Sequence, residues 1–77
     1  MEKILINWLK MRFLNCSILT PQSLEEKLNY YANRMCNFKV HDDFVVDMYD
    51  ESNFVKSFKF TIVNSYIRDI SSMPNQG

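Results

Sequence analysis

His41 is the only histidine of the 77-residue chain, and it begins the run His41-Asp42-Asp43. An imidazole that exchanges a proton with a neighbouring carboxylate is the pairing used in general-base catalysis. Adjacent side chains of a strand point to opposite faces, so His41 and Asp42 meet only where the segment turns. Because no nucleophile is evident beside them, we expect a solvated loop and no catalytic residues.

Cys16 and Cys36 are the only cysteines, and together with His41 they present the atoms that zinc binds. The spacing is twenty positions from Cys16 to Cys36 and five from Cys36 to His41. Zinc sites that can be recognised in a sequence have short, paired spacings, which this pattern lacks. We therefore expect two partly buried, reduced thiols and neither a metal nor another cofactor.

Glycine occurs once, at Gly77. Phosphate-binding loops and nucleophile elbows both need glycine where the backbone approaches a ligand or turns sharply. The scarcity of glycine therefore excludes most large enzyme classes, and we expect a protein that is not an enzyme.

Basic and aromatic residues are interleaved in residues 56–63, which read KSFKFTIV. On a strand, such a pattern can stack bases on rings and pair phosphates with cations. The stretch resembles the central strand of RNA recognition motifs through Lys56, Phe58 and Phe60, whereas Lys59 stands where that family has a small residue. The chain also ends before that family's second helix and last strand would fit. Nucleic-acid binding by these four residues is one alternative, and two core rings beside two solvated lysines is the other.

Aromatic side chains in the first half of the chain suit a protein interface, because Tyr and Trp dominate binding hot spots. On a helix, Tyr30 points about 100° away from Tyr31, so the two rings do not share one face. An aromatic residue off the apolar stripe is a candidate anchor for a partner. The candidate partner-binding residues are Trp8, Tyr30, Tyr31 and Arg34.

Two helices are predicted before residue 36. In residues 2–15, apolar side chains recur at three- and four-residue spacing, which favours a helix, although an alternation around Ile6 leaves a strand as the competitor. Residues 21–35 follow Thr20, a helix-capping residue, and Pro21, which fits a first turn. One apolar stripe is formed there by Leu24, Leu28, Tyr31 and Met35.

The second half of the chain favours strands. Residues 44–49 and 54–62 are rich in Phe, Val and Tyr, and a polar link joins them, which predicts a hairpin over 44–62. If Tyr49 faces Phe54, Asp47 lies opposite Lys56. After the hairpin we expect a short helix over 64–71. A third helix over 53–70, giving an all-α three-helix bundle, is the alternative.

Length and composition predict one small folded domain. Hydrophobic residues make up 47% of the chain, and nine basic and nine acidic residues give a formal net charge of zero. Disordered chains combine low hydrophobicity with high net charge, and neither holds here. We expect a single α+β domain over 1–70, two amphipathic helices followed by an antiparallel hairpin, and a flexible tail over 71–77.

The balanced charge also bears on partners, because binding to phosphate backbones needs a basic surplus. No apolar run approaches the roughly 20 residues of a membrane span, and no signal peptide is recognised, so we expect a cytoplasmic protein without a membrane partner. Gly and Ala occur once each. Scarcity of residues with G/C-rich codons indicates an A/T-rich genome, as in many bacteriophages and mobile elements.

These features favour a small protein that binds another protein. An inhibitor, immunity or antitoxin-like protein, or a phage-encoded modulator of a host protein, would act by covering a functional surface of its partner. Self-association into a homo-oligomer is a further alternative. The second functional hypothesis is a nucleic-acid-binding regulator that uses residues 56–63.

Overall fold

The structure is a computed structural model that describes residues 2–74 of the chain. Within these residues, two helices precede four strands, so the fold is α+β, as the sequence predicts. The elements in chain order are α1 (Glu2–Phe13), α2 (Pro21–Ala32), β1 (Asn37–Val40), β2 (Val45–Asp50), β3 (Asn53–Val63) and β4 (Tyr66–Ser72).

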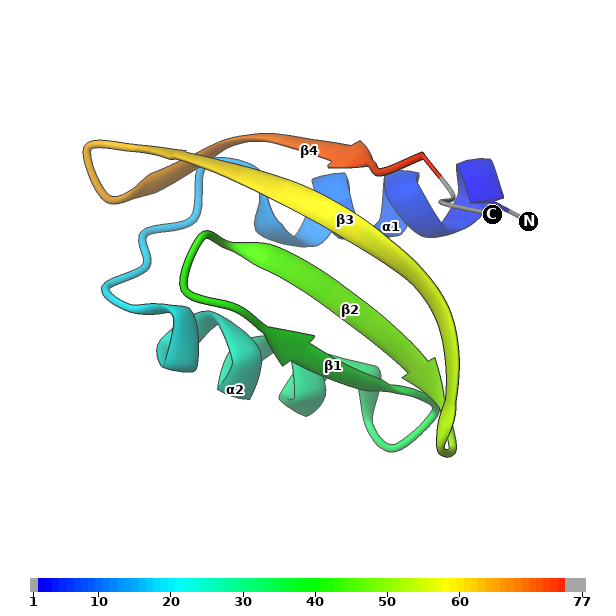
Figure 1. Cartoon of the computed structure of the whole chain (residues 1–77). Helices are drawn as coiled ribbons and strands as arrows, with labels where there is room; N and C mark the ends of the chain where they lie inside the picture. The colour runs from blue at the N-terminus through cyan, green and yellow to red at the C-terminus, as the bar shows by residue number, and fades with distance from the viewer. Residues whose placement is uncertain (1, 75–77) are drawn as a thin grey trace.

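The strands form one antiparallel sheet in the order β1-β2-β3-β4, and both helices lie against the same face of it (Figure 1). α2 packs against β1 and α1 packs against β4, so each helix covers an edge strand. The molecule therefore has two layers. The opposite face of the sheet, which we call the open face, carries no helix of the described residues.

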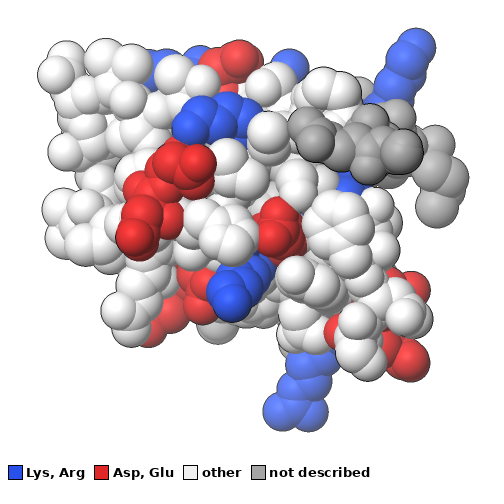
Figure 2. Space-filling view, in the orientation of Figure 1, with Lys and Arg blue, Asp and Glu red and all other residues white. Residues whose placement is uncertain are grey.

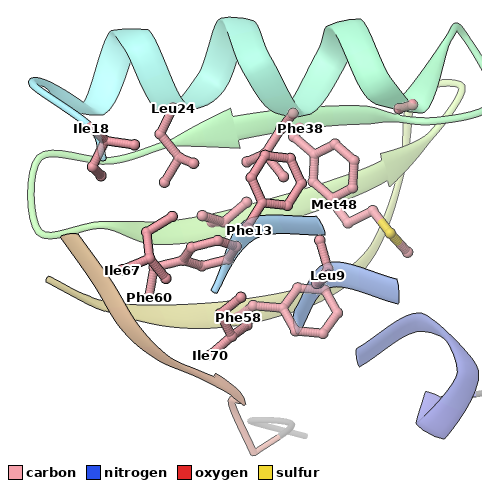
Figure 3. Packing of buried hydrophobic residues seen from close by; sticks show 13 residues of the cluster. Leu9, Phe13, Ile18, Leu24, Phe38, Met48, Phe58, Phe60, Ile67 and Ile70 are labelled. Atoms are coloured by element: carbon pink, nitrogen blue, oxygen red, sulfur yellow. The ribbon is translucent and has the colours of Figure 1, made fainter. Parts of the chain in front are cut away.

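The hydrophobic core lies between the two layers, where side chains from both helices and all the strands converge (Figure 3). On the strands, buried and exposed positions mostly alternate, because successive side chains point to opposite faces. The core residues are Leu9, Phe13, Ile18, Leu24, Leu28, Ala32, Phe38, Val46, Met48, Phe58, Phe60, Ile67 and Ile70.

α2 begins as the sequence predicts, with Thr20 as its capping residue and Pro21 in the first turn. The Thr20 side chain accepts a hydrogen bond from the Ser23 backbone N–H at 3.0 Å. In return, the Ser23 hydroxyl accepts one from the Thr20 N–H at 3.1 Å. Two N–H groups that the helix leaves unpaired are thus satisfied.

The end of α2 differs from the prediction of a helix to residue 35. Asn33 and Arg34 have left-handed backbone conformations, with φ of 52° and 69°, and these stop the helix at Ala32. The buried stripe consequently passes through Ala32, whereas Tyr31 is 37% exposed and Met35 is 84% exposed. The predicted stripe was wrong at these last two positions.

β1 was not predicted, and side chains of α2 hold it in place. The Asn29 amide pairs with both backbone groups of Phe38, donating to its carbonyl at 3.0 Å and accepting from its N–H at 2.8 Å. Glu25 accepts from the Val40 N–H at 2.8 Å. This sheet edge is therefore paired by side chains rather than left open.

The predicted hairpin over 44–62 is confirmed as β2 and β3, and Tyr49 does pair with Phe54. The expected pairing of Asp47 with Lys56 was wrong. A bulge at Val55 adds one residue to β3, so Met48 pairs with Lys56 and Asp47 pairs with Ser57. The bulge places Lys56 on the helix-covered face, away from Asp47.

β4 replaces the short helix predicted over 64–71, and the three-helix alternative is likewise wrong. Asn64 and Ser65 both have positive φ, 53° and 70°, which is the geometry of a tight hairpin turn. β4 then runs back along β3 to Ser72, so it includes the first two residues of the predicted tail. Residues 75–77 of that tail lie outside the described residues.

The start of β4 also receives hydrogen bonds from the segment that joins the helices. Ile67 donates to the Cys16 carbonyl at 3.0 Å and accepts from the Asn15 N–H at 2.8 Å. In residues 2–74, neither helix is long and apolar enough to cross a membrane.

Candidate functional site

An apolar groove opens between the N-terminal half of α1, the C-terminal end of α2 and one end of the sheet. Its volume is about 710 Å³. Ten of its eleven lining residues are apolar or aromatic or cysteine, and Lys56 is the only charged one. The lining residues are Ile4, Leu5, Trp8, Tyr31, Ala32, Met35, Cys36, Phe38, Met48, Val55 and Lys56.

The groove exists because the helices sit over the two edge strands. Strands separated by three sheet spacings lie about 14 Å apart, whereas packed helices lie about 8–10 Å apart. In the described residues, no Cα atom of α1 comes within 8 Å of one in α2. Only side chains can fill the gap between the helices. They fill it along part of its length and leave it open at one end, which is the groove.

Aromatic rings fill the inner part of this gap. Phe13 lies edge-on to Tyr31 at 5.7 Å between ring centroids and to Trp8 at 6.2 Å. Tyr30 contacts Tyr31 at 5.3 Å. Such edge-to-face pairs contribute beyond their buried area, so the inner wall of the groove is preformed.

The candidate partner-binding residues differ in whether they line the groove or lie beside it. Trp8 and Tyr31 line the groove, and Tyr30, 77% exposed, stands beside Tyr31. Arg34 is exposed in the turn after α2 and precedes Met35, which lines the groove. The aromatic candidates thus gather at one surface, although they come from two helices.

Sequence reasoning missed the aliphatic part of the groove. Ile4 is 70% exposed, Met35 84% and Val55 46%. Met35 was assigned to the apolar stripe of the second helix, and Ile4 is one of the apolar residues whose spacing predicts a helix over 2–15. The left-handed residues after Ala32 turn Met35 outward, and the bulge leaves Val55 unpaired in the sheet; the periodic pattern of the sequence signals neither irregularity.

Cys36 forms part of the groove wall. Burial raises the pKa of its thiol, and the negative charge of Asp50 raises it further. The neutral thiol is a weak nucleophile, so this cysteine acts as a small apolar wall residue. Cys16 lies after α1, where its thiol donates to the Arg12 carbonyl at 3.3 Å.

The residues of the nucleic-acid hypothesis do not form one surface. Phe58 and Phe60 are 0% and 1% exposed, so neither ring offers a face on which a base can stack. Lys56 lies on the helix-covered face, at the groove. Lys59 pairs with Val45 and donates to the backbone carbonyl of Asp43 at 2.5 Å.

The open face holds a small polar cluster around Asp47. One carboxylate oxygen of Asp47 lies 2.7 Å from His41 Nε2, and the other accepts from the Ser57 hydroxyl at 2.5 Å. Burial raises the pKa of Asp47. This rise is outweighed by the hydrogen bonds to His41 and Ser57 and by the nearby charges of His41 and Lys39, which lower the pKa. The net effect is a lowered pKa and a stable carboxylate.

This cluster does not have the arrangement of a nucleophilic triad. In a triad, the imidazole stands between the hydroxyl and the carboxylate, so that it takes the proton of the nucleophile. Here Asp47 stands between His41 and Ser57. The partner of His41 is also Asp47 from β2 rather than Asp42, because the segment 41–44 turns and β1 pairs with β2.

The charges of the open face are mixed. In the view of Figure 2, basic and acidic side chains are interspersed among neutral ones, and neither sign covers a continuous area. No three His, Cys, Asp or Glu side chains of residues 2–74 are grouped so that they could hold a metal ion. Among these features of residues 2–74, the apolar groove is the one whose lining suits a binding site.

Comparison with protein-family models, with curated proteins and with solved structures finds no match. The function must therefore be inferred from the geometry of the groove and its surroundings.

Proposed function

We propose that this protein is a small non-catalytic module that binds another protein through the apolar groove. The observation that supports the proposal is the exposure of large apolar side chains around a preformed hollow. Ile4 and Met35, which line the groove, and Tyr30, which contacts Tyr31, are each 70% exposed or more. Single exposed apolar residues are ordinary, but a group of them around a groove is typical of an interaction site.

The mechanism is steric. A partner that inserts apolar side chains into the groove would bury Trp8 and Tyr31 together, and such aromatic side chains dominate binding energy. The bound domain would then cover the partner's surface. An inhibitor, immunity or antitoxin-like protein acts in this way, as does a phage-encoded modulator of a host protein, and we propose this class of role in the cytoplasm.

The nucleic-acid alternative has less support. Its aromatic residues are in the core, and its lysines lie on opposite faces of β3. Binding that depends on many phosphate contacts would weaken steeply with salt. A mobility shift that is strong at low salt and lost on substitution of Lys59 would favour this alternative over the groove.

The test is capture of a partner from nuclease-treated lysate of the source organism, read by mass spectrometry. The tagged full chain is compared with Met35→Glu and Val55→Glu, each of which puts a carboxylate at the groove. We expect a stoichiometric partner protein with the unaltered chain and its loss with both variants, because a buried unpaired charge opposes apolar contact.

Leu19→Glu is the matched control. Leu19 is 84% exposed, the same as Met35, but it does not line the groove. We expect Leu19→Glu to keep the partner. Capture that survives both groove variants, or no protein partner at all, would contradict the proposed function.

A further inference from the structure

β3 is longer than its neighbour β2, so its last residues have no strand beside them on that side. β2 begins at Val45, which pairs with Lys59, whereas β3 continues to Val63. Among the described residues, the last hydrogen bond across this side runs from the Phe60 N–H to the Phe44 carbonyl at 3.0 Å. The β3–β4 turn therefore projects past the β1–β2 turn (Figure 1).

The chain leaves the line of β2 at Phe44. This residue has a left-handed backbone with φ of 62°, and its N–H donates to the His41 carbonyl at 2.9 Å rather than to β3. A left-handed residue at this point closes the tight connection between β1 and β2. Strand pairing on this side of β3 consequently stops opposite Phe60.

Ile62 lies in the part of β3 that has no neighbour there. It faces Ile67 of β4, whose N–H and C=O both point outward and bond to Cys16 and Asn15. The backbone groups of two such facing residues in an antiparallel pair point in opposite directions. The N–H and C=O of Ile62 therefore point to the β2 side, where no group of residues 2–74 bonds to them.

A hollow of about 480 Å³, which we call the notch, lies beside these two backbone groups. Ile18, Leu19, Phe44 and Ile62 form its apolar lining, and Thr61 is among its polar residues. Leu19 is 84% exposed. The notch thus combines an apolar hollow with one backbone donor and one backbone acceptor at its edge.

This combination is complementary to an extended peptide backbone. A segment placed beside Ile62 would accept from its N–H and donate to its C=O, as an added strand does. The side chain of the residue facing Ile62 would point to the same side as Ile62, into the apolar hollow, and its two neighbours would point outward beside Thr61. Lys59 and Asp43 line the notch with opposite charges, so the lining favours a segment without net charge.

We propose that the notch binds a short extended segment of a partner protein, which places one aliphatic side chain in the hollow and pairs its backbone with Ile62. The notch lies before the start of α2 and the groove lies at its end, so this inference goes beyond the proposed function. A second copy of this chain fits less well. Insertion of one of its strands would be a head-to-tail contact, which repeats from copy to copy.

The test begins with selection of short displayed peptides of random sequence against the Met35→Glu variant of the full chain, whose groove carries a charge. We expect the selected peptides to share one Ile, Val or Leu between polar residues. They should bind the unaltered chain within about twofold of the variant, because the two sites are separate. The NMR signal of the Ile62 amide should shift on binding, and its hydrogen exchange should slow.

Leu19→Glu tests the hollow, and Met35→Glu is its matched control, because both side chains are 84% exposed. We expect Leu19→Glu to weaken the selected peptides by at least about tenfold, since it puts a carboxylate in the apolar lining. Met35→Glu should leave their affinity unchanged.

N-methylation of the peptide tests the backbone pairing. A methyl group on the amide of the aliphatic residue removes the donor to the Ile62 carbonyl, and we expect a loss of about tenfold in affinity. The same change on the next residue, whose N–H points away from β3, should have a smaller effect.

Peptides that bind Leu19→Glu as tightly as the unaltered chain, equal effects of the two N-methylations, or no selected peptide would overturn the inference. So would self-association that rises with concentration and that Leu19→Glu abolishes, because the occupant would then be a second copy. Failure of the proposed function is distinguishable. A captured partner that is lost with Met35→Glu reports on the groove, whereas peptides selected on Met35→Glu and lost with Leu19→Glu report on the notch.

Discussion

Glu51, in the turn between β2 and β3, has a left-handed backbone with φ of 57°. A residue with a Cβ pays about 1–2 kcal/mol for that conformation, and glycine does not. We predict that Glu51→Gly raises the free energy of unfolding by about 0.5–1 kcal/mol, after the greater flexibility of glycine in the unfolded chain is subtracted. Urea denaturation measures the change.

Ser52→Gly is the control in the same turn. Ser52 does not have a positive φ, so glycine there only adds freedom to the unfolded chain and should lower stability. Equal effects of the two substitutions would show that backbone strain at Glu51 is not the cause.

The lowered pKa of Asp47 predicts how the free energy of unfolding depends on pH. Its pKa is lowered in the folded protein, although burial alone raises it, because His41 and Ser57 hydrogen-bond to the carboxylate. The stability it contributes is therefore present above its unfolded pKa of about 4 and is lost as the pH falls through the lower folded value. We predict that Asp47→Asn lowers the free energy of unfolding at pH 7, and that this deficit narrows below about pH 4.

Urea denaturation across pH 7 to about pH 2.5 gives the profile. Asp42→Asn, which removes an exposed carboxylate from the neighbouring turn, is the control for a general charge effect. A deficit in Asp47→Asn that stays constant through the acid range would contradict the linkage.

The Asn29 side chain links α2 to β1 through hydrogen bonds. Its removal tests whether these bonds stabilise β1, the strand that was not predicted. Asn29→Ala removes the two hydrogen bonds to Phe38 and leaves two backbone groups without partners. We expect a loss of about 1–3 kcal/mol in the free energy of unfolding, even though alanine is the better helix former. Gln22→Ala, at an exposed position of the same helix, should be neutral or slightly stabilising.

Hydrogen exchange locates the effect. The Phe38 amide donates to Asn29, so its exchange should be faster in Asn29→Ala than in the unaltered chain. This increase should exceed any increase at the amides of β3. Unchanged exchange at Phe38 would mean that neighbouring strand pairing, rather than the Asn29 side chain, protects β1.

The helices and the central hairpin could be predicted because their signals are local. Thr20 and Pro21 mark the start of α2, and a richness in Phe, Val and Tyr marks β2 and β3 with the residue before them. β4 could not be recognised by its period, since residues 64–71 also satisfy helical spacing. Only pairing with β3, through the positive-φ turn at Asn64, selects the strand, and pairing is a long-range property.

The candidate site was predictable only in part for the same reason. Trp8, Tyr30 and Tyr31 were identified by residue type, and they do gather at one surface. Their aliphatic neighbours were not, because the exposure of Met35 and Val55 depends on where a helix stops and where a strand bulges. The site is assembled from local irregularities that periodic patterns do not encode.

The whole molecule separates residues that fold it from residues that surround the groove. Leu28 is fully buried and Met35 is 84% exposed, although both were assigned to one stripe. We predict that Leu28→Ala lowers the free energy of unfolding by about 2–5 kcal/mol. Because a domain this small has a low free energy of unfolding, many of its molecules would then be unfolded. The double variant Ile4→Ser, Met35→Ser should change stability by about 0.5 kcal/mol or less per site.

Thermal and urea unfolding of these variants shows whether the exposed apolar side chains of the groove contribute to stability. Retained stability in the double variant, together with loss of the captured partner, means that the exposed apolar side chains serve binding and not folding. A loss of more than about 2 kcal/mol would place them in the energetics of the core instead. The groove would then be a packing defect of a small two-layer fold, and the proposed binding function would lose the observation that supports it.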